Sequence, residues 1–236
     1  MSHNPIICAI DTTDVEKAKE LAGSLSGSVG ALKLGLEFFT ANGAGGVRQL
    51  SSTRAPIFLD LKFHDIPNTV AGAIRATAGI DSFMMTVHTQ GGKAMMRAAV
   101  DASMEVAATT GKARPLVVAV TILTSLDQHD LTAIGVTAAM ADQVKRLADL
   151  AHMAGLDGVV CSPHEIAILR EHCGPDFKLV VPGIRPEGSA AGDQKRTMTP
   201  REAVQHGADY LVIGRPITES ADPRAAAQAI LKSLQA

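Results

Sequence analysis

The sequence predicts a single-domain α/β protein in which eight parallel strands close into a (β/α)8 barrel, the TIM barrel, across residues 1–236. Eight short apolar runs alternate with alanine-rich segments at helical period, which is typical of right-handed βαβ units in a parallel sheet. A chain of 236 residues suits one such barrel, since these commonly run to about 250 residues. The first run ends Ile10-Asp11-Thr12-Thr13 without a G-x-G-x-x-G turn, so the barrel is favoured over a doubly wound open sheet.

The elements follow in order along the chain. Each strand run is too short for a helix and continuously apolar, as expected of strands buried on both faces; the runs lie near 5–10, 30–34, 56–61, 83–88, 115–123, 157–161, 178–182 and 208–213. Helical segments between them include 14–25, 67–79, 92–107, 137–154, 163–172 and 200–207. Helix start signals are Thr13 before Asp14, Ser162-Pro163 and Thr199-Pro200. The loop-like stretch 185–197 is expected to be a mobile phosphate lid after the seventh strand.

Composition excludes several classes of function. Twenty-two Lys and Arg against 24 Asp and Glu leave a net charge of −2, which argues against a broad basic face for nucleic acid or a polybasic membrane anchor. With no Trp, one Tyr and six Phe, the chain has few platforms on which bases could stack. A small basic cluster, enough to bind one phosphate, remains compatible with this balance.

Cysteine usage and the first residues bear on the compartment. Cys8, Cys161 and Cys173 are odd in number and far apart, so no disulfide framework is expected and a reducing cytoplasm is indicated. The start, MSHNPII, lacks a charged segment followed by a long apolar stretch, so no signal peptide is expected. No apolar run approaches the roughly 18 residues of a membrane span.

In a barrel of this kind, chemistry lies at the carboxyl ends of the strands. Polar residues stand at these ends or just after them: Asp11, Lys33, Asp60, Lys62, Asp65, His88, Thr121, Thr124, Arg185, Gly214 and Arg215. The notable group is the two lysines and three aspartates on three adjacent strands. We therefore expect the active site at this end.

The segment D-L-K-F-H-D (60–65) is the centre of this group. Strand alternation puts Asp60 and Lys62 on one face, about 6.6 Å apart along the strand. Charges inside a barrel are costly unless paired, and Lys33 on the neighbouring strand can pair with Asp60. The plainer alternative is a structural ion-pair network that closes the barrel mouth.

This pattern also indicates a reaction. Carboxylates on either side of Lys62 favour its ammonium form, which suits a proton donor to a carbanion and not a Schiff-base nucleophile. Asp60 would repel an anionic substrate group by on the order of 4 kcal/mol at about 4 Å and an effective dielectric near 20. Loss of CO₂ would relieve that repulsion. Proton donation and carboxylate repulsion together predict decarboxylation without a cofactor.

A phosphate site is expected after the seventh and eighth strands. The chain reads Pro182-Gly183-Ile184-Arg185 after one and Ile213-Gly214-Arg215-Pro216 after the other, and barrels commonly bind phosphate with these two loops. Gly214 would allow close backbone approach and Arg215 would supply a forked cation. The alternative is a glycine turn followed by a surface arginine.

The eight histidines are dispersed without metal-ligand spacing, so no metal site is predicted. His88 is expected to be a structural histidine with its hydrogen bonds satisfied, and His64 to pack locally.

A family resemblance rests on an ordered set of motifs. FLDLKFHDIPNTV (58–70) resembles the signature of the orotidine 5′-phosphate decarboxylase family. Further matches follow the same order over essentially the full chain: ID (10–11), KLG (33–35), VHTQGG (87–92), AVTILTS (119–125), DGVVCSPHE (157–165), VVPGIRPEG (180–188), DQKR (193–196) and VIGRPIT (212–218). D-x-K-x-x-D alone is weak because related sugar-phosphate enzymes share it, whereas the ordered set is specific.

The resemblance implies a (β/α)8 fold and conversion of orotidine 5′-phosphate to UMP, with no metal or organic cofactor. It implies that Lys62 protonates C6 of the pyrimidine as CO₂ leaves and that Asp60 lies against the substrate carboxylate, while Lys33 and Asp65 complete the charge array. It also implies a homodimer in which Asp65 and Thr69 reach into the partner's site.

Substrate-binding roles are implied in the same way. Asp11 and Lys33 would hold ribose hydroxyls and Thr124 the pyrimidine edge. Phosphate would be bound by Gln194, Gly214 and Arg215, with Arg185 at the base of the lid.

Two other functions compete with this one. Metal-dependent sugar-phosphate decarboxylases or aldolases share the barrel, but those relatives have a glutamate where Lys33 stands, and a lysine there would repel Mg²⁺. A non-catalytic nucleotide-binding barrel is the second alternative, and nothing in the sequence favours it.

Overall fold

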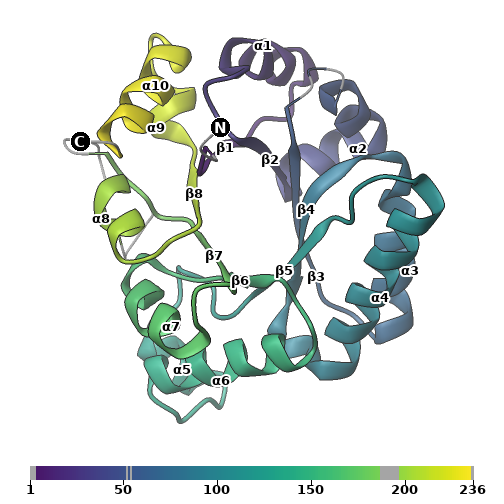
Figure 1. The fold of residues 1–236 in the computed structure, drawn as a ribbon, viewed down its shortest axis with the longest axis vertical. Coiled ribbons are helices and arrows are strands. Elements are labelled where there is room, and N and C mark those ends of the chain that lie inside the picture. Colours follow the sequence, from purple (N-terminus) through teal and green to yellow (C-terminus); the bar gives the residue numbers. More distant parts are fainter. Residues whose placement is uncertain (1–3, 52, 54, 187–196, 235–236) are drawn as a thin grey trace.

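Eight parallel strands form a closed ring in the computed structural model, which describes residues 4–51, 53, 55–186 and 197–234. The ring closes where the first strand pairs with the last, with Ile6 opposite Leu211 and Cys8 opposite Ile213 (Figure 1). The strands are β1 (Ile6–Ile10), β2 (Ala31–Gly35), β3 (Ile57–Phe63), β4 (Ser82–His88), β5 (Leu116–Val120), β6 (Gly158–Val160), β7 (Lys178–Val181) and β8 (Tyr210–Ile213). The predicted (β/α)8 barrel is confirmed.

Helices surround the ring on its outside (Figure 1). The α-helices are α1 (Val15–Leu25), α2 (Leu36–Ser51), α3 (Pro67–Ala76), α4 (Gly92–Thr110), α5 (Gln128–Ala133), α6 (Met140–Met153), α7 (Ile166–Cys173), α8 (Pro200–Gln205), α9 (Arg215–Thr218) and α10 (Pro223–Ser233). The described residues also form three short 3₁₀ turns: η1 (Thr77–Gly79), η2 (Thr89–Gly91) and η3 (Pro163–Glu165).

Most helix start signals act as predicted. Thr199 forms a capping box with Glu202 at α8, and Ser162 does the same at η3, which leads into α7. At α1 the cap is Asp14, whose carboxylate accepts from the backbone N–H groups of the first turn, so Thr13 as the start residue is wrong. Asp and Thr are both good caps, and sequence alone does not separate adjacent candidates.

Several element boundaries differ from expectation by up to three residues, as in α4, which ends at Thr110 and not near 107. β5 ends at Val120 and not near 123, because its last ladder partners are His88 on β4 and Val160 on β6, beyond which neither neighbour continues. The segment 67–79 divides into α3 and the 3₁₀ turn η1.

The apolar core has two parts. The larger part lies between the strands and the surrounding helices, and includes Leu32, Leu59 and Met85. The smaller part fills the barrel interior; its buried residues are Ile7, Ala9, Ala31, Phe58, Met84, Val118, Val180, Tyr210 and Val212. Side chains alternate between these two cores along the strands, as expected for a sheet buried on both faces, except that Phe83 and Met84 of β4 both contact the inner core.

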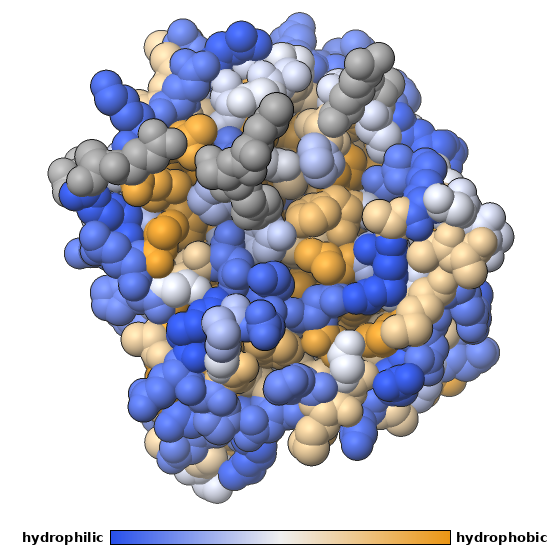
Figure 2. All heavy atoms as spheres, viewed as in Figure 1, coloured by the Kyte–Doolittle hydropathy of each residue, from blue (hydrophilic) through white to orange (hydrophobic). Residues whose placement is uncertain are grey.

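No disulfide links the described cysteines, and Cys8 and Cys161 are buried core residues, as predicted. Burial, with a smaller effect of Asp11, raises the pKa of Cys8 to about 12, so this thiol is chemically inert. None of the helices in the described part of the chain is both long and apolar enough to cross a membrane. On the face shown in Figure 2, apolar surface is broken up by hydrophilic residues.

Candidate active site

The inner face of four adjacent strands changes from apolar to polar toward the carboxyl end of the barrel. For each of β1 to β4, a polar residue lies two positions after a residue of the interior core. The pairs are Ala9 and Asp11, Ala31 and Lys33, Phe58 and Asp60, and Met84 and Thr86. Strand alternation keeps each such pair on one face. The same periodicity that fills the barrel with apolar side chains therefore delivers these polar groups to its mouth.

Three of the predicted residues meet directly. The Lys62 ammonium donates to both carboxylate oxygens of Asp60, at 3.0 Å each. The Lys33 Nζ lies 3.6 Å from Asp60 Oδ2. Asp60 is thus held between two cations from β2 and β3.

Asp11 extends this arrangement, because its Oδ1 lies 3.5 Å from the Lys33 Nζ. The order within one chain is Asp11–Lys33–Asp60–Lys62, an alternation of charge across three strands. Exposure rises from the middle outward: the Lys33 and Asp60 side chains are 13% and 12% exposed, and those of Lys62 and Asp11 are 31% and 58% exposed. The array is therefore anchored inside the barrel and open at both ends.

The environment of Asp60 keeps it ionised. Burial alone would raise its pKa, but the charges of Lys33 and Lys62, with hydrogen bonds from Lys62 and Thr86, outweigh burial and hold the pKa below its ordinary value. A carboxylate fixed in this state at the mouth is set to repel a second carboxylate placed beside it.

Glycine makes space for Lys33. A Cβ on Gly35 would lie 3.0 Å from the Lys33 Nζ and 3.8 Å from Asp11 Oδ1, and the first distance is too short for an ordinary contact. The absence of a side chain at Gly35 thus leaves the ammonium group in reach of both carboxylates.

Lys62 does not sit in a regular strand, which differs from the simple alternation expected for 60–65. Its φ of 51° lies in the left-handed region, which costs a non-glycine residue on the order of 1 kcal/mol or more. The β3–β4 register shifts here, from Leu59 opposite Met85 to Phe63 opposite Val87. Such bulges re-aim side chains next to active sites. The lysine consequently folds back onto Asp60.

Sequence reasoning missed Thr86, which lies in the middle of β4. Its side chain is fully buried, its Oγ1 donates to Asp60 Oδ1 at 2.9 Å, and the Lys62 backbone N–H donates to it at 2.8 Å. The available signal was a single hydroxyl inside the apolar run FMMTVH.

His88 and His64 lie beside this group. Their rings stack with centroids 5.3 Å apart and an interplanar angle of 23°, which agrees with local packing of His64. His88 Nδ1 is buried without a hydrogen-bond partner among the described residues, so the expectation of a fully satisfied histidine is wrong. Burial, the neighbouring His64 and the charge of Lys62 lower the pKa of His88, which favours a neutral ring.

The predicted phosphate residues follow β7 and β8. Arg185 is held by its backbone N–H, which donates to the Met198 carbonyl at 3.0 Å. Gly214 caps α9, whose first residue is the exposed Arg215. A Cβ on Gly214 would lie 3.8 Å from Asp11 Oδ2, so this turn adjoins the end of the charge array.

Other predicted residues lie around or outside this centre. Thr124 follows β5 and is half-buried. Gln194 and most of the predicted lid, 187–196, lie outside the described residues. Asp65 is exposed and its carboxylate accepts from the next backbone N–H, of Ile66, at 2.7 Å. Thr69 is exposed in α3. Since the structure is of one chain, their reach into a partner subunit stays a prediction.

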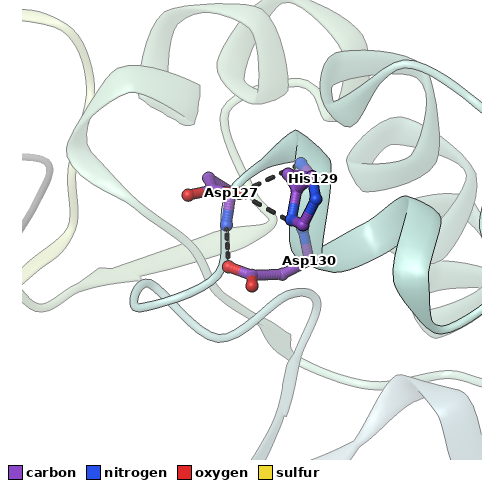
Figure 3. A group of neighbouring side chains, drawn as sticks. All are labelled: Asp127, His129 and Asp130. Carbon is purple, nitrogen blue, oxygen red and sulfur yellow. Dashed lines mark hydrogen bonds between the residues drawn. The ribbon is translucent and has the colours of Figure 1, made fainter.

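One group of potential metal ligands lies elsewhere. Ligand atoms of Asp127, His129 and Asp130 lie within 4.8 Å of one another (Figure 3). Asp127 Oδ1 accepts from the His129 and Asp130 backbone N–H groups, and Asp130 Oδ2 accepts from the Asp127 N–H. These bonds form the capping box of α5, which accounts for the grouping.

Comparison with known proteins agrees with this geometry. A family model described as "Orotidine 5'-phosphate decarboxylase / HUMPS family" matches residues 4–230. The protein named orotidine 5′-phosphate decarboxylase from Paramagnetospirillum magneticum is 55% identical over 231 residues, which cover 98% of each chain. The one from Rhodospirillum rubrum is 54% identical over 231 residues, covering 98% of this chain and 94% of that relative.

A solved structure agrees as well. The crystal structure of orotidine 5′-phosphate decarboxylase from Lactobacillus acidophilus matches with a TM-score of 0.88 and 37% identity, and the match covers 99% of this chain and 100% of that one. The chain belongs to the orotidine 5′-phosphate decarboxylase / HUMPS family.

Proposed function

We propose that this protein is a carbon–carbon lyase that decarboxylates orotidine 5′-phosphate to UMP in pyrimidine biosynthesis. Relatives bearing that name share about half of its residues over nearly the whole chain. The observation that carries the proposal at the level of chemistry is the buried Asp60 carboxylate held between the Lys33 and Lys62 ammonium groups. This arrangement offers a fixed anion and a proton donor at one place.

Lys62 is the proton donor in this proposal. The C6–carboxylate bond breaks, its electron pair stays on C6 of the pyrimidine, and a proton from the Lys62 Nζ is transferred to C6 as CO₂ leaves. The charge on C6 lies in the plane of the ring, where π delocalisation does not help. Its stabilisation comes mainly from preorganised charges and hydrogen bonds. The Lys62 Nζ, oriented by both Asp60 oxygens at 3.0 Å, is such a group.

Asp60 acts on the leaving carboxylate of the substrate. It lies against the substrate carboxylate, and its repulsion, on the order of 4 kcal/mol at about 4 Å, disappears when neutral CO₂ forms. Lys33 keeps Asp60 ionised and, with Asp11, holds the ribose hydroxyls. No metal or organic cofactor takes part in this scheme.

Substrate binding uses the remaining predicted residues. Thr124 binds the pyrimidine edge, while Gln194, Gly214 and Arg215 bind the phosphate. Arg185 stands at the base of a lid over about 185–197. Binding energy from the distant phosphate closes the lid and holds the reacting end in place.

The enzyme acts as a cytoplasmic homodimer in this proposal. Asp65 completes the charge array across the interface and Thr69 contacts substrate in the partner's site. The exposure of both residues in a single chain supports this arrangement, as does Ile66 between them, whose large apolar side chain is 67% exposed. Free cysteines suit a reducing compartment.

Metal-dependent sugar-phosphate chemistry is the competing function, because the family description covers more than one group. Lys33 argues against metal-dependent chemistry. Its ammonium group lies 3.6 Å from Asp60, at a place where a bound divalent cation would need a second acidic ligand and would instead be repelled. The test uses chelator-treated, metal-free protein and orotidine 5′-phosphate, followed by ultraviolet absorbance. We expect full activity without added metal. Tight UMP binding with no CO₂ release would instead indicate a non-catalytic barrel.

A mixing experiment tests the shared site. Lys62→Ala and Asp65→Ala chains are each expected to be inactive as homodimers. Hybrid dimers should regain activity, because one of their two sites receives both an intact Lys62 and an intact Asp65. No recovery despite demonstrated subunit exchange would place Asp65 in its own chain's site.

A further inference from the structure

We propose that Thr86 is a positioning residue for the decarboxylation: its hydroxyl holds the Asp60 carboxylate and the Lys62 backbone in one fixed arrangement. This inference rests on the proposed function. It concerns a residue that does not touch substrate and acts through the two residues that do.

The hydroxyl of Thr86 is used in both directions. It donates its one proton to Asp60 Oδ1 at 2.9 Å and accepts from the Lys62 backbone N–H at 2.8 Å. An ionised carboxylate only accepts and a backbone N–H only donates, so these two bonds fix the orientation of the hydroxyl. The side chain is fully buried, so bulk solvent does not compete for either bond.

The irregularity of β3 explains why this hydroxyl is needed. Leu59 pairs with Met85, and the next pair is Phe63 with Val87. Three residues of β3, Asp60 to Lys62, therefore stand opposite Thr86 alone. The ladder is broken there, and the Lys62 N–H bonds to the Thr86 side chain in place of a strand carbonyl.

Loss of the hydroxyl would affect both reacting groups. Asp60 Oδ1 would lose a hydrogen bond that sets the plane of the carboxylate. Lys62, whose backbone is strained with a φ of 51°, would lose the hydrogen bond of its backbone N–H. The Lys62 Nζ donates to the same Asp60 carboxylate. Displacement of the carboxylate and displacement of the Lys62 backbone would therefore both shift the Lys62 ammonium group. Misplacement of catalytic groups by about 1 Å costs roughly a hundredfold in rate.

The experiment compares Thr86→Val and Thr86→Ser in the full-length protein. Valine keeps the shape of threonine and removes the hydroxyl, whereas serine keeps the hydroxyl. We expect Thr86→Val to lower kcat roughly 10- to 100-fold, with KM within about threefold because the phosphate and ribose contacts remain. Thr86→Ser should recover most of the kcat.

Thr89→Val is the matched control. Thr89 is also fully buried and follows the same strand, but its hydroxyl donates to the Val120 carbonyl at 2.8 Å, away from Asp60 and Lys62. Both valine variants lose the hydrogen bonds of one fully buried hydroxyl, two in each case, so both should lose a similar amount of thermal stability. Only Thr86→Val should change kcat.

The pH dependence of kcat distinguishes a positioning role of Thr86 from a purely structural one, because a purely structural role would leave that pH dependence unchanged. The charged groups facing Asp60 are Lys33 from β2 and Lys62 from β3, with Asp11 beyond Lys33 and the titratable ring of His88 beyond Lys62. All four remain in Thr86→Val. Removing a donor to the carboxylate raises its pKa, so the acid limb of kcat should move to higher pH in Thr86→Val and stay in place in Thr89→Val.

Parent-like kcat and an unmoved acid limb in a folded Thr86→Val would overturn the proposal. If Thr86→Val does not fold, Thr86→Ala takes its place, and parent-like kcat in that variant would overturn it equally. Failure of the parent protein to release CO₂ would instead count against the proposed function, which separates the two.

Discussion

Charged residues stand at both ends of this barrel, and they are used differently. At the carboxyl end, the hydrogen bonds and ion pairs of the Lys33 and Lys62 ammonium groups within the described chain go to carboxylates alone. At the amino end, Arg114 pairs with Asp157 before β6, and Arg170 pairs with Asp209 before β8. The charged side chains at the carboxyl end pair with one another, whereas those at the amino end also form hydrogen bonds with backbone groups.

The amino-end pairs tie strand starts together. Asp157 Oδ2 accepts from the Val117 N–H at 2.7 Å, and Asp209 Oδ2 accepts from the Leu179 N–H at 2.9 Å. Arg170 donates to the Phe177 and Gly174 carbonyls. Each of these charged side chains forms a hydrogen bond with a backbone N–H or carbonyl group that would otherwise be left without a partner.

The difference separates structural charge at the amino end from the charge at the carboxyl end that we propose to be catalytic. A pair that satisfies backbone groups contributes to folding because its loss leaves buried donors or acceptors unmatched. A set of cations and carboxylates that bind one another, on a strained backbone, contributes little to folding and remains available to a ligand. Position at the strand ends alone would not have distinguished the two.

The largest expected effect is on catalysis at the carboxyl end. Lys62→Ala should lower kcat by roughly 10⁴-fold, because the proposed proton donor is lost. The barrel should still fold, since Lys33 remains to pair with the buried Asp60 carboxylate. Lys178→Ala removes a lysine that pairs with Asp209 at the other end and should leave kcat unchanged. Near-normal turnover in Lys62→Ala would contradict the assigned role.

A smaller effect is expected on stability at the amino end. Arg170→Ala should lower the free energy of unfolding by about 3 kcal/mol, measured by urea denaturation, because Asp209 and several carbonyls lose their donor. The kcat of the folded fraction should not change. Arg97→Ala, which removes an exposed pair with Asp101, should cost under about 1 kcal/mol. If Arg97→Ala costs as much, the backbone contacts of Arg170 are not the cause.

The smallest expected effect is in the pH dependence of stability. The folded-state pKa of Asp60 lies below its ordinary value, so its contribution is present above the unfolded pKa and is lost as pH falls through the folded one. The difference in unfolding free energy between the parent and Asp60→Asn should therefore shrink below about pH 4. A difference that stays constant from pH 6 to 3 would show that Asp60 is not stabilised as an anion.

Much of this architecture could be predicted from the sequence. Eight apolar runs gave the strands and their order, and polar residues at the run ends indicated Asp11, Lys33 and Asp60. These predictions hold because strand period and barrel closure determine which side chains share a face. The end of β5 at Val120 was missed because it depends on the length of its neighbours.

The detail of the site could not be predicted in the same way. Plain alternation places Lys62 beside Asp60 but does not show the left-handed backbone or the register shift at Leu59. Thr86 was missed because a hydroxyl in an apolar strand carries no charge to mark it. Its partner, the Lys62 N–H, lacks a carbonyl partner in the neighbouring strand only because of the bulge. Both features arise from pairing between two strands, which one strand's sequence does not encode.

Closure of the ring through β1 and β8 has a consequence for biosynthesis. Asp11 follows the first strand and Gly214 follows the last, yet they are neighbours in the folded chain. A nascent polypeptide that has emerged from the ribosome only as far as β7 lacks one wall of the proposed substrate site. Catalytic competence should therefore appear abruptly during synthesis, when the final strand docks, because contacts of such long sequence separation form late in folding.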